Sequence, residues 1–354
     1  MALIPPHRWL CRCLAPEALC PTTELTPTLD SPGFLWEPML ALAHRHLVAA
    51  PWYAALRRRD LLERAPAEMV EHLVVLHELS IQRNRLLRRE LIRAAHAFNA
   101  LGVEPLLLKG ALALLPGQPP EIAARLLGDL DLLIPADRLA DCRNALQALG
   151  YSATHKEDHH TSHHHAPPLF HPDHGAKFEL HRAALGGPLA AALPAEEVWR
   201  NSQPISIERT FVRTPSLTHR VLHNLLHTLI QDHRAELGTV ELRQVLDLVQ
   251  FRAHEDAGID WPLIRTRFAA LGQGATLGGY LRITHNLFNQ PPPDGIRFSI
   301  ATAWLEWKFE LCRRHRGASR GFYWWMRLKR LPKRLGTPSW YAMKIRALRS
   351  GESL

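Results

Sequence analysis

The stretch from Leu106 to His181 constrains the fold most, because short apolar runs in it carry acidic residues at alternate positions. Runs of this length that favour strands and are bounded by Gly or Pro predict buried β-strands. Side chains alternate along a strand, so Asp129 and Asp131 point to the same face. Glu179 and His181 share one face of a later strand for the same reason.

Carboxylates on buried strands are unfavourable unless a cation or a proton offsets their charge. Three acids that converge at the ends of sheet strands therefore form a candidate site for hard divalent metal ions. Two simpler interpretations remain open. Asp-x-Asp at a strand end is often a solvated turn cap, and Glu179 could be a structural partner of Arg125 or His181. The presence of Lys109, Arg125 and Glu179 in this order favours the metal site.

The motifs stand in the order Lys109-Gly110, Arg125-x-x-x-Asp129-x-Asp131 and Glu179-x-His181. In this order and spacing they resemble the uncharacterised nucleotidyltransferase family of the DNA polymerase β-like superfamily, from about Leu76 to Val249. One departure concerns the turn that grips phosphate. The wider superfamily carries Gly-Ser there, whereas this chain has Lys109-Gly110-Ala111.

The resemblance implies an α+β fold, with a small mixed β-sheet nucleotidyltransferase core flanked by N-terminal and C-terminal helical blocks. It also implies a metal-dependent enzyme that transfers NMP from an NTP to a hydroxyl or phosphate acceptor on a small molecule, peptide or glycan. The alternative is a non-catalytic nucleotide- or nucleic-acid-binding module with the same fold. A missing acid would indicate that alternative, and none is missing.

Nucleotidyl transfer is an in-line displacement that two Mg²⁺ ions can assist at the entering and leaving oxygens, and Mn²⁺ is a possible substitute. The resemblance implies that Asp129 and Asp131 bridge the two ions. Glu179 would hold the ion that activates the acceptor hydroxyl.

Three residues are the expected nucleotide contacts. Lys109 would act as a point charge on the triphosphate, and Arg125 as a bidentate fork. Gly110 lets the backbone approach phosphate because it has no Cβ. His181 is expected to support the site by orienting a metal ligand.

A stripe of histidines follows on a predicted helix, where His219, His223 and His227 are spaced at i, i+4 and i+8. A metalloprotease motif would have Glu after the first His of such a pair, but Asn224 stands there. We expect His223 and His227, with Asp247 of the next helix, to form either a buried hydrogen-bonded set or part of the acceptor pocket.

Composition and periodicity divide the chain into five regions. They are an irregular N-terminal arm (1–38), a helical region (39–102), the nucleotidyltransferase core (103–214), a helical bundle (215–290) and a basic, aromatic C-terminal region (291–354). Strands in the core are expected at Leu106–Leu108, in the run Arg125–Ile134 that contains Asp129 and Asp131, at Tyr151–Lys156 and at Ala176–His181, with a last strand or hairpin at Gln203–Arg213. Helices are expected in the bundle at Leu217–Ile230, Ala235–Arg252, Trp261–Leu271 and Thr276–Phe288.

The 354-residue chain has a net charge of +9, which suggests an anionic partner such as nucleotide, nucleic acid or a membrane surface. Its five scattered cysteines fit a reducing compartment better than a disulfide framework. No apolar run is long enough for a membrane span, and no signal-peptide pattern is present. The expected location is the cytoplasm, with peripheral membrane binding as an option.

Two further segments leave alternatives open. The histidine-rich segment 155–174 is either a polar loop or a promiscuous site for Zn²⁺ or Ni²⁺. From Leu311 to Gly351 there are twelve Lys or Arg residues and no acid, with interleaved tryptophans and tyrosines. This region could lie on an anionic membrane, grip a nucleic-acid backbone, or pack its aromatic residues on the helical bundle.

Overall fold

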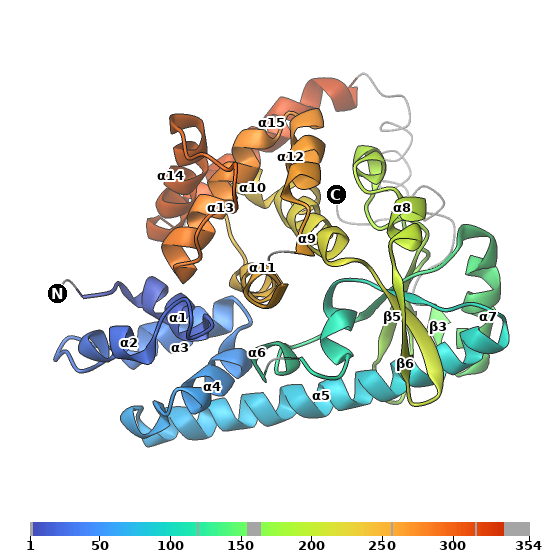
Figure 1. Cartoon of the computed structure of the whole chain (residues 1–354), viewed down its shortest axis with the longest axis horizontal. Helices are drawn as coiled ribbons and strands as arrows, with labels where there is room; N and C mark the ends of the chain where they lie inside the picture. The colour runs from blue at the N-terminus through green and yellow to red at the C-terminus, as the bar shows by residue number, and fades with distance from the viewer. Residues whose placement is uncertain (1–2, 119, 154–163, 256–257, 316, 336–354) are drawn as a thin grey trace.

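The strands expected in the core form one mixed sheet in a computed structural model of the chain. The structure describes residues 3–118, 120–153, 164–255, 258–315 and 317–335. Helical blocks from the N-terminal and C-terminal parts of the chain lie to one side of the sheet, which is at the right of the molecule in Figure 1. The predicted α+β fold class is therefore confirmed.

The described part of the sheet has seven strands in the order β3-β4-β5-β2-β1-β7-β6. They are β1 (Leu106–Leu107), β2 (Leu130–Leu133), β3 (Ser152–Ala153), β4 (Leu169–Phe170), β5 (Lys177–His181), β6 (Gln203–Ile207) and β7 (Thr210–Thr214). The central β2 pairs in parallel with β5 and antiparallel with β1. The expected hairpin is β6–β7. β4 has no counterpart among the expected strands, and the end of the strand expected at Tyr151–Lys156 lies outside the described residues.

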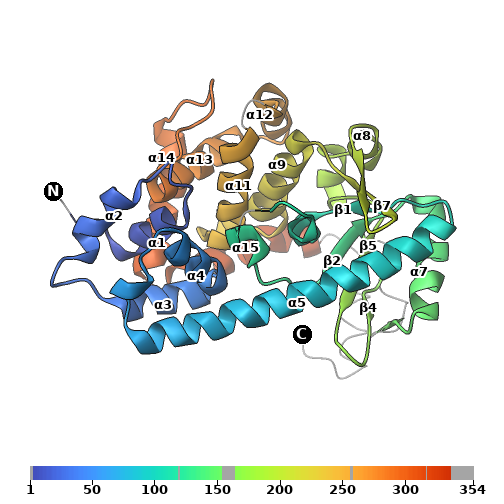
Figure 2. The same cartoon turned by 60° about the horizontal axis from the view of Figure 1, so that its bottom comes forward.

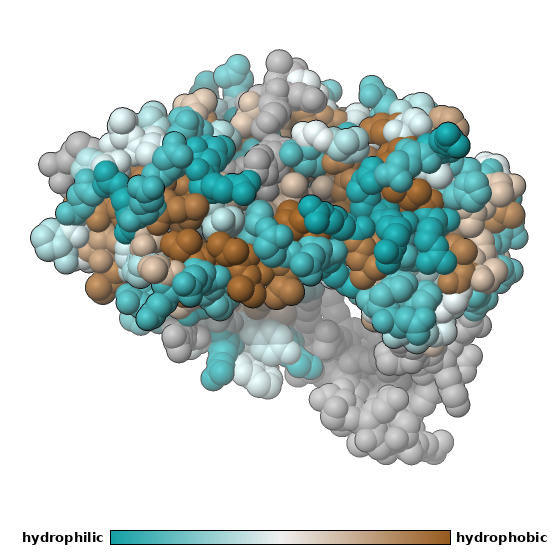
Figure 3. Space-filling model, turned by 90° about the horizontal axis from the view of Figure 1, so that it is seen from below, coloured by the Kyte–Doolittle hydropathy of each residue, from teal (hydrophilic) through white to brown (hydrophobic). Residues whose placement is uncertain are grey.

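The helix α5 (Ala67–Ala100) runs along the sheet and on toward the N-terminal block (Figure 2). Its apolar residues recur at steps of three and four, so Leu87 and Phe98 are fully buried. Seen from below, this side of the molecule mixes hydrophobic and hydrophilic residues (Figure 3). Val75 and Leu79 of α5 are 55% and 56% exposed. The helix thus covers the core with one face and meets solvent with the other.

The interpretation of residues 1–38 as an irregular arm is wrong for the described part of that segment. It contains α1 (Pro6–Leu14) and α2 (Thr22–Leu29), and α3 (Trp36–Arg45) begins within it. Pro6 is the first residue of α1, where its fixed φ suits a helix and no N–H is needed. Trp9 packs edge-to-face on Phe34, with ring centroids 5.1 Å apart. The prolines therefore start the helix, and buried aromatic rings hold it.

The other α-helices before the helical bundle are α4 (Ala49–Arg58), α6 (Pro120–Ala123), α7 (Leu139–Ala148) and α8 (Ala195–Arg200). The helices of the C-terminal part are α9 (Leu217–Leu226), α10 (Arg234–Leu237), α11 (Leu242–Glu255), α12 (Trp261–Ala270), α13 (Gly274–Phe288), α14 (Ile300–Arg314) and α15 (Ala318–Leu335). The helix expected at Ala235–Arg252 is divided because Gly238 adopts φ +65° and ends α10. No helix in the described part of the chain combines the length and apolar character that crossing a bilayer requires.

Candidate metal and nucleotide site

The acidic residues on β2 and β5 come together on one face of the sheet. Asp131 lies opposite Glu179 in the parallel register, and His181 is two residues further along β5. Side chains two residues apart share a face, so all three project to the same side. One ligand atom from each lies within 4.8 Å of the other two. Because metal–oxygen distances for Mg²⁺ and Ca²⁺ are about 2.0–2.6 Å, this spacing is close to that of ligands around one cation.

Asp129 stands just before β2 and is connected to this cluster through a lysine. The Nζ atom of Lys177 lies 2.8 Å from Asp129 Oδ2 and 2.7 Å from Glu179 Oε1. Burial would lower the pKa of Lys177, but the hydrogen bonds to these two carboxylates raise it above its ordinary value. A stable ammonium therefore sits between two of the predicted metal ligands.

Asp131 is 3% exposed and is held in its ionised form. Nζ of Lys109 and Nε2 of His181 each lie 2.8 Å from its Oδ1 atom. Burial alone would raise the pKa of Asp131, but the Lys109 ammonium and the His181 imidazole outweigh it and hold the pKa well below its usual range. Nδ1 of His181 is buried and lacks a hydrogen-bond partner among the described residues. His181 therefore acts on the site through Nε2.

Lys109 opens the 3-10 helix η2 (Lys109–Leu114) with φ +46°, a left-handed conformation that is uncommon for a residue with a Cβ. Burial would lower the pKa of Lys109, but the charge of Asp131 raises it above its ordinary value. At the next residue, Gly110, a Cβ would lie 2.8 Å from Leu127 Cδ2. A larger residue at this position would therefore require the Leu127 side chain to move.

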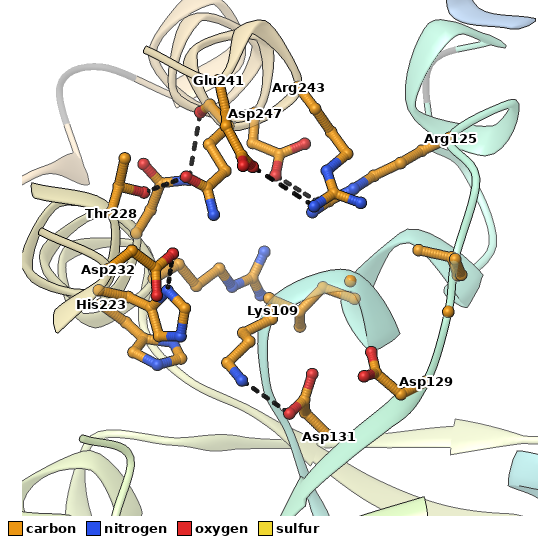
Figure 4. A pocket seen from close by; sticks show the side chains of 18 of the residues that line it. Lys109, Arg125, Asp129, Asp131, His223, Thr228, Asp232, Glu241, Arg243 and Asp247 are labelled. Carbon is orange, nitrogen blue, oxygen red and sulfur yellow. Dashed lines mark hydrogen bonds and ion pairs between the residues drawn. The ribbon is translucent and has the colours of Figure 1, made fainter. Parts of the chain in front are cut away.

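Arg125 is engaged on the opposite, helical side of the site. Its guanidinium pairs with the carboxylate of Asp247 in α11, and these side chains are 11% and 8% exposed. Figure 4 shows Arg125 reaching from the segment before β2 toward Asp247. This ion pair was not predicted, because it joins residues 122 positions apart in the chain.

The structure does not form the predicted hydrogen-bonded set of His223, His227 and Asp247. His223 Nε2 lies 3.1 Å from the carbonyl oxygen of Ala184, and His227 Nδ1 lies 3.2 Å from Asp232 Oδ2. Burial lowers the pKa of His223 well below its ordinary value, so that imidazole is uncharged. A neutral imidazole offsets a buried carboxylate poorly, whereas arginine stays charged, which explains why Asp247 pairs with arginine.

A cavity of about 260 Å³ lies between the sheet acids and the helices α9 and α11 (Figure 4). Among the predicted site residues, it is lined by Lys109, Gly110, Arg125, Asp129, Asp131, His223, His227 and Asp247. Cationic and polar side chains outside the prediction also line it, including Arg220, Arg243 and Thr228. The cavity therefore joins the acidic strand ends to a helical wall rich in charged groups.

Several contributors to the site were missed at the sequence level. Lys177 could have been found, because the alternation that places Glu179 and His181 on one face places Lys177 there too. Asp232 follows the π-helical turn His227–Gln231, which extends α9 and which no sequence pattern indicated. Arg220 and Arg243 lie on predicted helices, but their direction depends on how those helices pack.

The donor set of Asp131, Glu179 and His181 fits a divalent cation. Carboxylate oxygens suit Mg²⁺, and imidazole is acceptable to Mn²⁺ and other first-row metals. The two lysines supply positive charge to the same carboxylates that a metal ion would bind. The site therefore has the carboxylate and imidazole ligands that a metal centre needs. In this structure the ammonium groups of Lys109 and Lys177 contact the carboxylates.

The described end of the histidine-rich segment lies beside the same cluster. The rings of His164 and His165 are each 5.3 Å from the ring of His181, centroid to centroid. Burial lowers the pKa of His164 to about 3, so it carries no charge at neutral pH. Residues 154–163 of this segment lie outside the described residues. Within the described chain, the only group of three potential metal ligands at this spacing is Asp131, Glu179 and His181.

Comparison with known proteins identifies the family to which the chain belongs. A search of curated proteins gave no match. The chain is similar to a solved structure described as an antigenic nucleotidyltransferase-like protein from Paracoccidioides brasiliensis. That match has 16% identity and a TM-score of 0.34, and covers 57% of this chain and 93% of the other. Residues 32–289 match the family described as uncharacterised nucleotidyltransferase. Because this match covers well over half of the sequence, the chain belongs to the uncharacterised nucleotidyltransferase family.

Proposed function

We propose that the protein is a metal-dependent nucleotidyltransferase that moves NMP from an NTP to a hydroxyl or phosphate group of a small molecule, peptide or glycan. The observation that carries this proposal is the convergence of Asp131, Glu179 and His181 within 4.8 Å, with Asp129 linked to Glu179 through Lys177. Membership of the nucleotidyltransferase family supports the reaction class.

Asp129, Asp131 and Glu179 would hold two Mg²⁺ ions, or Mn²⁺ in their place. Such ions neutralise the charge on the entering and leaving oxygens of an in-line displacement. The protein's own contribution is to fix these carboxylates in place. Paired strands position Asp131 and Glu179, and the His181 imidazole restrains the Asp131 carboxylate.

Lys109 is the residue we assign to the triphosphate. Its ammonium lines the cavity next to the acids and is held by Asp131 at 2.8 Å. A cation at this position can bind a phosphate oxygen without leaving the site, because one ammonium has three donors. Arg125 is less free to do so, because its guanidinium is already paired with Asp247.

The helical wall of the cavity is where we place the acceptor. His223 and His227 line it opposite the sheet acids, together with Thr228. A neutral imidazole and a hydroxyl can each donate or accept a hydrogen bond, which suits recognition of an alcohol or a phosphate. The acceptor would then lie between this wall and the ion held by Glu179.

Pyrophosphate release from each of the four NTPs, measured with Mg²⁺, with Mn²⁺ and with a chelator, tests the proposal. We expect turnover that requires the metal and is abolished by Glu179→Gln. The matched control is Asp173→Asn, because Asp173 is an exposed acid in the turn before β5 whose side chain is 85% exposed. Nucleotide binding by the wild type without any pyrophosphate release would instead support the non-catalytic binding module.

A further inference from the structure

The C-terminal helix α15 has an apolar face that points away from the protein. Trp324, Trp325 and Leu328 are 61%, 67% and 61% exposed. With Gly321 they occupy positions i, i+3, i+4 and i+7, which form a single stripe along a helix. We call these four residues the outer stripe. An exposed apolar stripe of this kind indicates an interaction surface.

The other side of α15 packs on the protein and so fixes the direction of the outer stripe. Nζ of Lys308, from α14, lies 4.6 Å from the centre of the Phe322 ring. The same Nζ donates to the carbonyl oxygens of Ala235 and Glu236 at 2.9 and 2.6 Å, which ties α14 to α10. Phe322 therefore faces inward, while the outer stripe lies on a different side of the helix.

Basic side chains accompany the outer stripe. The helix contains six Lys or Arg residues and no acid. Arg320, Arg327 and Lys329 are exposed. Arg320 and Arg327 are seven residues apart and thus lie on one flank of the stripe. Arg327 is held over the Tyr323 ring at 5.5 Å and donates to the Tyr323 hydroxyl at 2.7 Å. The surface around the stripe is therefore positive.

This combination favours an anionic lipid bilayer over nucleic acid. Tryptophan and tyrosine settle at the level of lipid headgroups, where an apolar ring meets polar surroundings. Leu328 has no flat face on which a base could stack, but it can enter the acyl boundary. Lysine and arginine at the flank would contact the headgroups of anionic lipids.

We propose that α15 docks the protein on an anionic membrane surface, with the outer stripe inserted at the interface and the basic flank on the headgroups. The docking surface is separate from the cavity, since none of the outer stripe lines it. This inference does not depend on the proposed reaction.

Flotation with phosphatidylserine-containing vesicles tests the proposal on the full-length chain. We expect binding at low salt, weaker binding at high salt, and little binding to pure phosphatidylcholine. The double variant Trp324→Ser with Leu328→Ser should lower the affinity by about tenfold or more. Arg320→Gln with Arg327→Gln should reduce binding mainly to the anionic vesicles.

The matched control is Val75→Ser with Leu79→Ser on α5, which removes similarly exposed apolar side chains on the opposite side of the molecule (Figure 1). This variant should bind vesicles like the wild type. Nucleotide turnover should be unchanged in the outer-stripe variant, and its circular dichroism should match that of the wild type.

Should the outer-stripe variant fail to fold, wild-type tryptophan fluorescence provides the second measurement. Vesicles with brominated acyl chains should quench part of it. The proposal would be overturned if the wild type did not bind vesicles at low salt or showed no quenching. It would also be overturned if the outer-stripe variant bound vesicles as well as the wild type. Loss of oligonucleotide binding or of self-association in that variant, with vesicle binding unchanged, would likewise overturn it.

Discussion

Two buried aspartates lie on opposite sides of the cavity and differ in how their charge is offset. Asp131, on β2, is 3% exposed and contacts Lys109 and His181 through one oxygen. Asp247, on α11, is 6% exposed and pairs with Arg125. Burial raises the pKa of both acids. The cations reverse this for Asp131, whose pKa falls below its ordinary value, but not for Asp247, whose pKa stays above it.

The difference in pKa direction indicates that the two sides of the cavity have different roles. Lysine ammonium groups are strongly hydrated point charges on flexible chains, and metal ions or phosphate can exchange with them. Arginine forms a planar and persistent ion pair, which is better suited to holding two segments together. We infer that the sheet side carries the chemistry. The Arg125–Asp247 pair fastens the segment before β2 to the helical bundle.

The same substitution at the two aspartates should separate these roles. Asp131→Asn should reduce metal-dependent NTP turnover by about 100- to 1,000-fold, because stabilising charge at the transition state is worth about 3–4 kcal/mol for one group. At neutral pH the variant should lose the stability that the ionised carboxylate contributes, but the paired strands β2 and β5 should keep the fold. Pyrophosphate release at saturating NTP, with circular dichroism as the check on folding, measures both effects. Turnover near the wild-type rate would contradict the role of Asp131 as a metal ligand.

Asp247→Asn should act mainly on stability. Removing one partner leaves the buried Arg125 charge unpaired, which opposes folding. Because the raised pKa of Asp247 means that its ionised form also opposes folding, we expect a loss smaller than the roughly 3–5 kcal/mol typical of such changes. Urea unfolding followed by circular dichroism measures this. The double variant Asp247→Leu with Arg125→Met should recover most of the loss, since both charges are then gone. If the single variant were as stable as the wild type, the ion pair would not fasten the two parts.

Part of this comparison was accessible from the sequence and part was not. The alternation of residues along β5 was enough to place Glu179 with His181. Asp129 lies just before β2, and the structure connects it to the cluster through Lys177. The pairing of the two strands, which sets Asp131 opposite Glu179, is a tertiary property. The α1–α2 segment was misjudged because its prolines resemble those of a loop, while the buried contacts of Trp9 with distant rings leave no local pattern.

A smaller effect, on the KM for NTP, should distinguish Lys109 from Arg125 as the residue that binds phosphate. Lys109→Ala should raise the KM for NTP more than Arg125→Ala does, by roughly tenfold if one charge-assisted hydrogen bond is lost. Steady-state kinetics on both variants, compared at equal folded fractions, decides the ranking. A larger effect from Arg125→Ala would assign the phosphate contact to Arg125. Small effects in both would exclude both residues.

The pKa directions predict opposite responses to acid. The depressed pKa of Asp131 means that its carboxylate stabilises the fold above its unfolded pKa, near 4, and that this contribution is lost as pH falls. The raised pKa of Asp247 means that ionisation opposes folding above that pH and that the penalty disappears in acid. The unfolding free energy gap between wild type and Asp131→Asn should therefore shrink from pH 7 to pH 3. The difference in unfolding free energy between the wild type and Asp247→Asn should instead increase from pH 7 to pH 3.

Urea unfolding in the presence of a chelator, repeated at several pH values, measures these slopes. Each unit of pKa displacement corresponds to about 1.4 kcal/mol. Asp173→Asn again provides the control, with a gap that stays near zero, because the Asp173 side chain is 85% exposed. If the unfolding free energy differences of the two variants changed with pH in the same direction, the two aspartates would not differ in how their charge is offset.

The most direct test of the central claim is Mn²⁺ binding, followed by calorimetry on the wild type, Glu179→Gln and Lys177→Met. We predict that the wild type binds Mn²⁺ and that Glu179→Gln weakens this binding strongly, because it removes a ligand of the cluster. Lys177→Met should bind Mn²⁺ more tightly, because it removes the ammonium held between Asp129 and Glu179 at 2.8 and 2.7 Å. Equal Mn²⁺ affinity in all three proteins would contradict a metal centre built on these carboxylates.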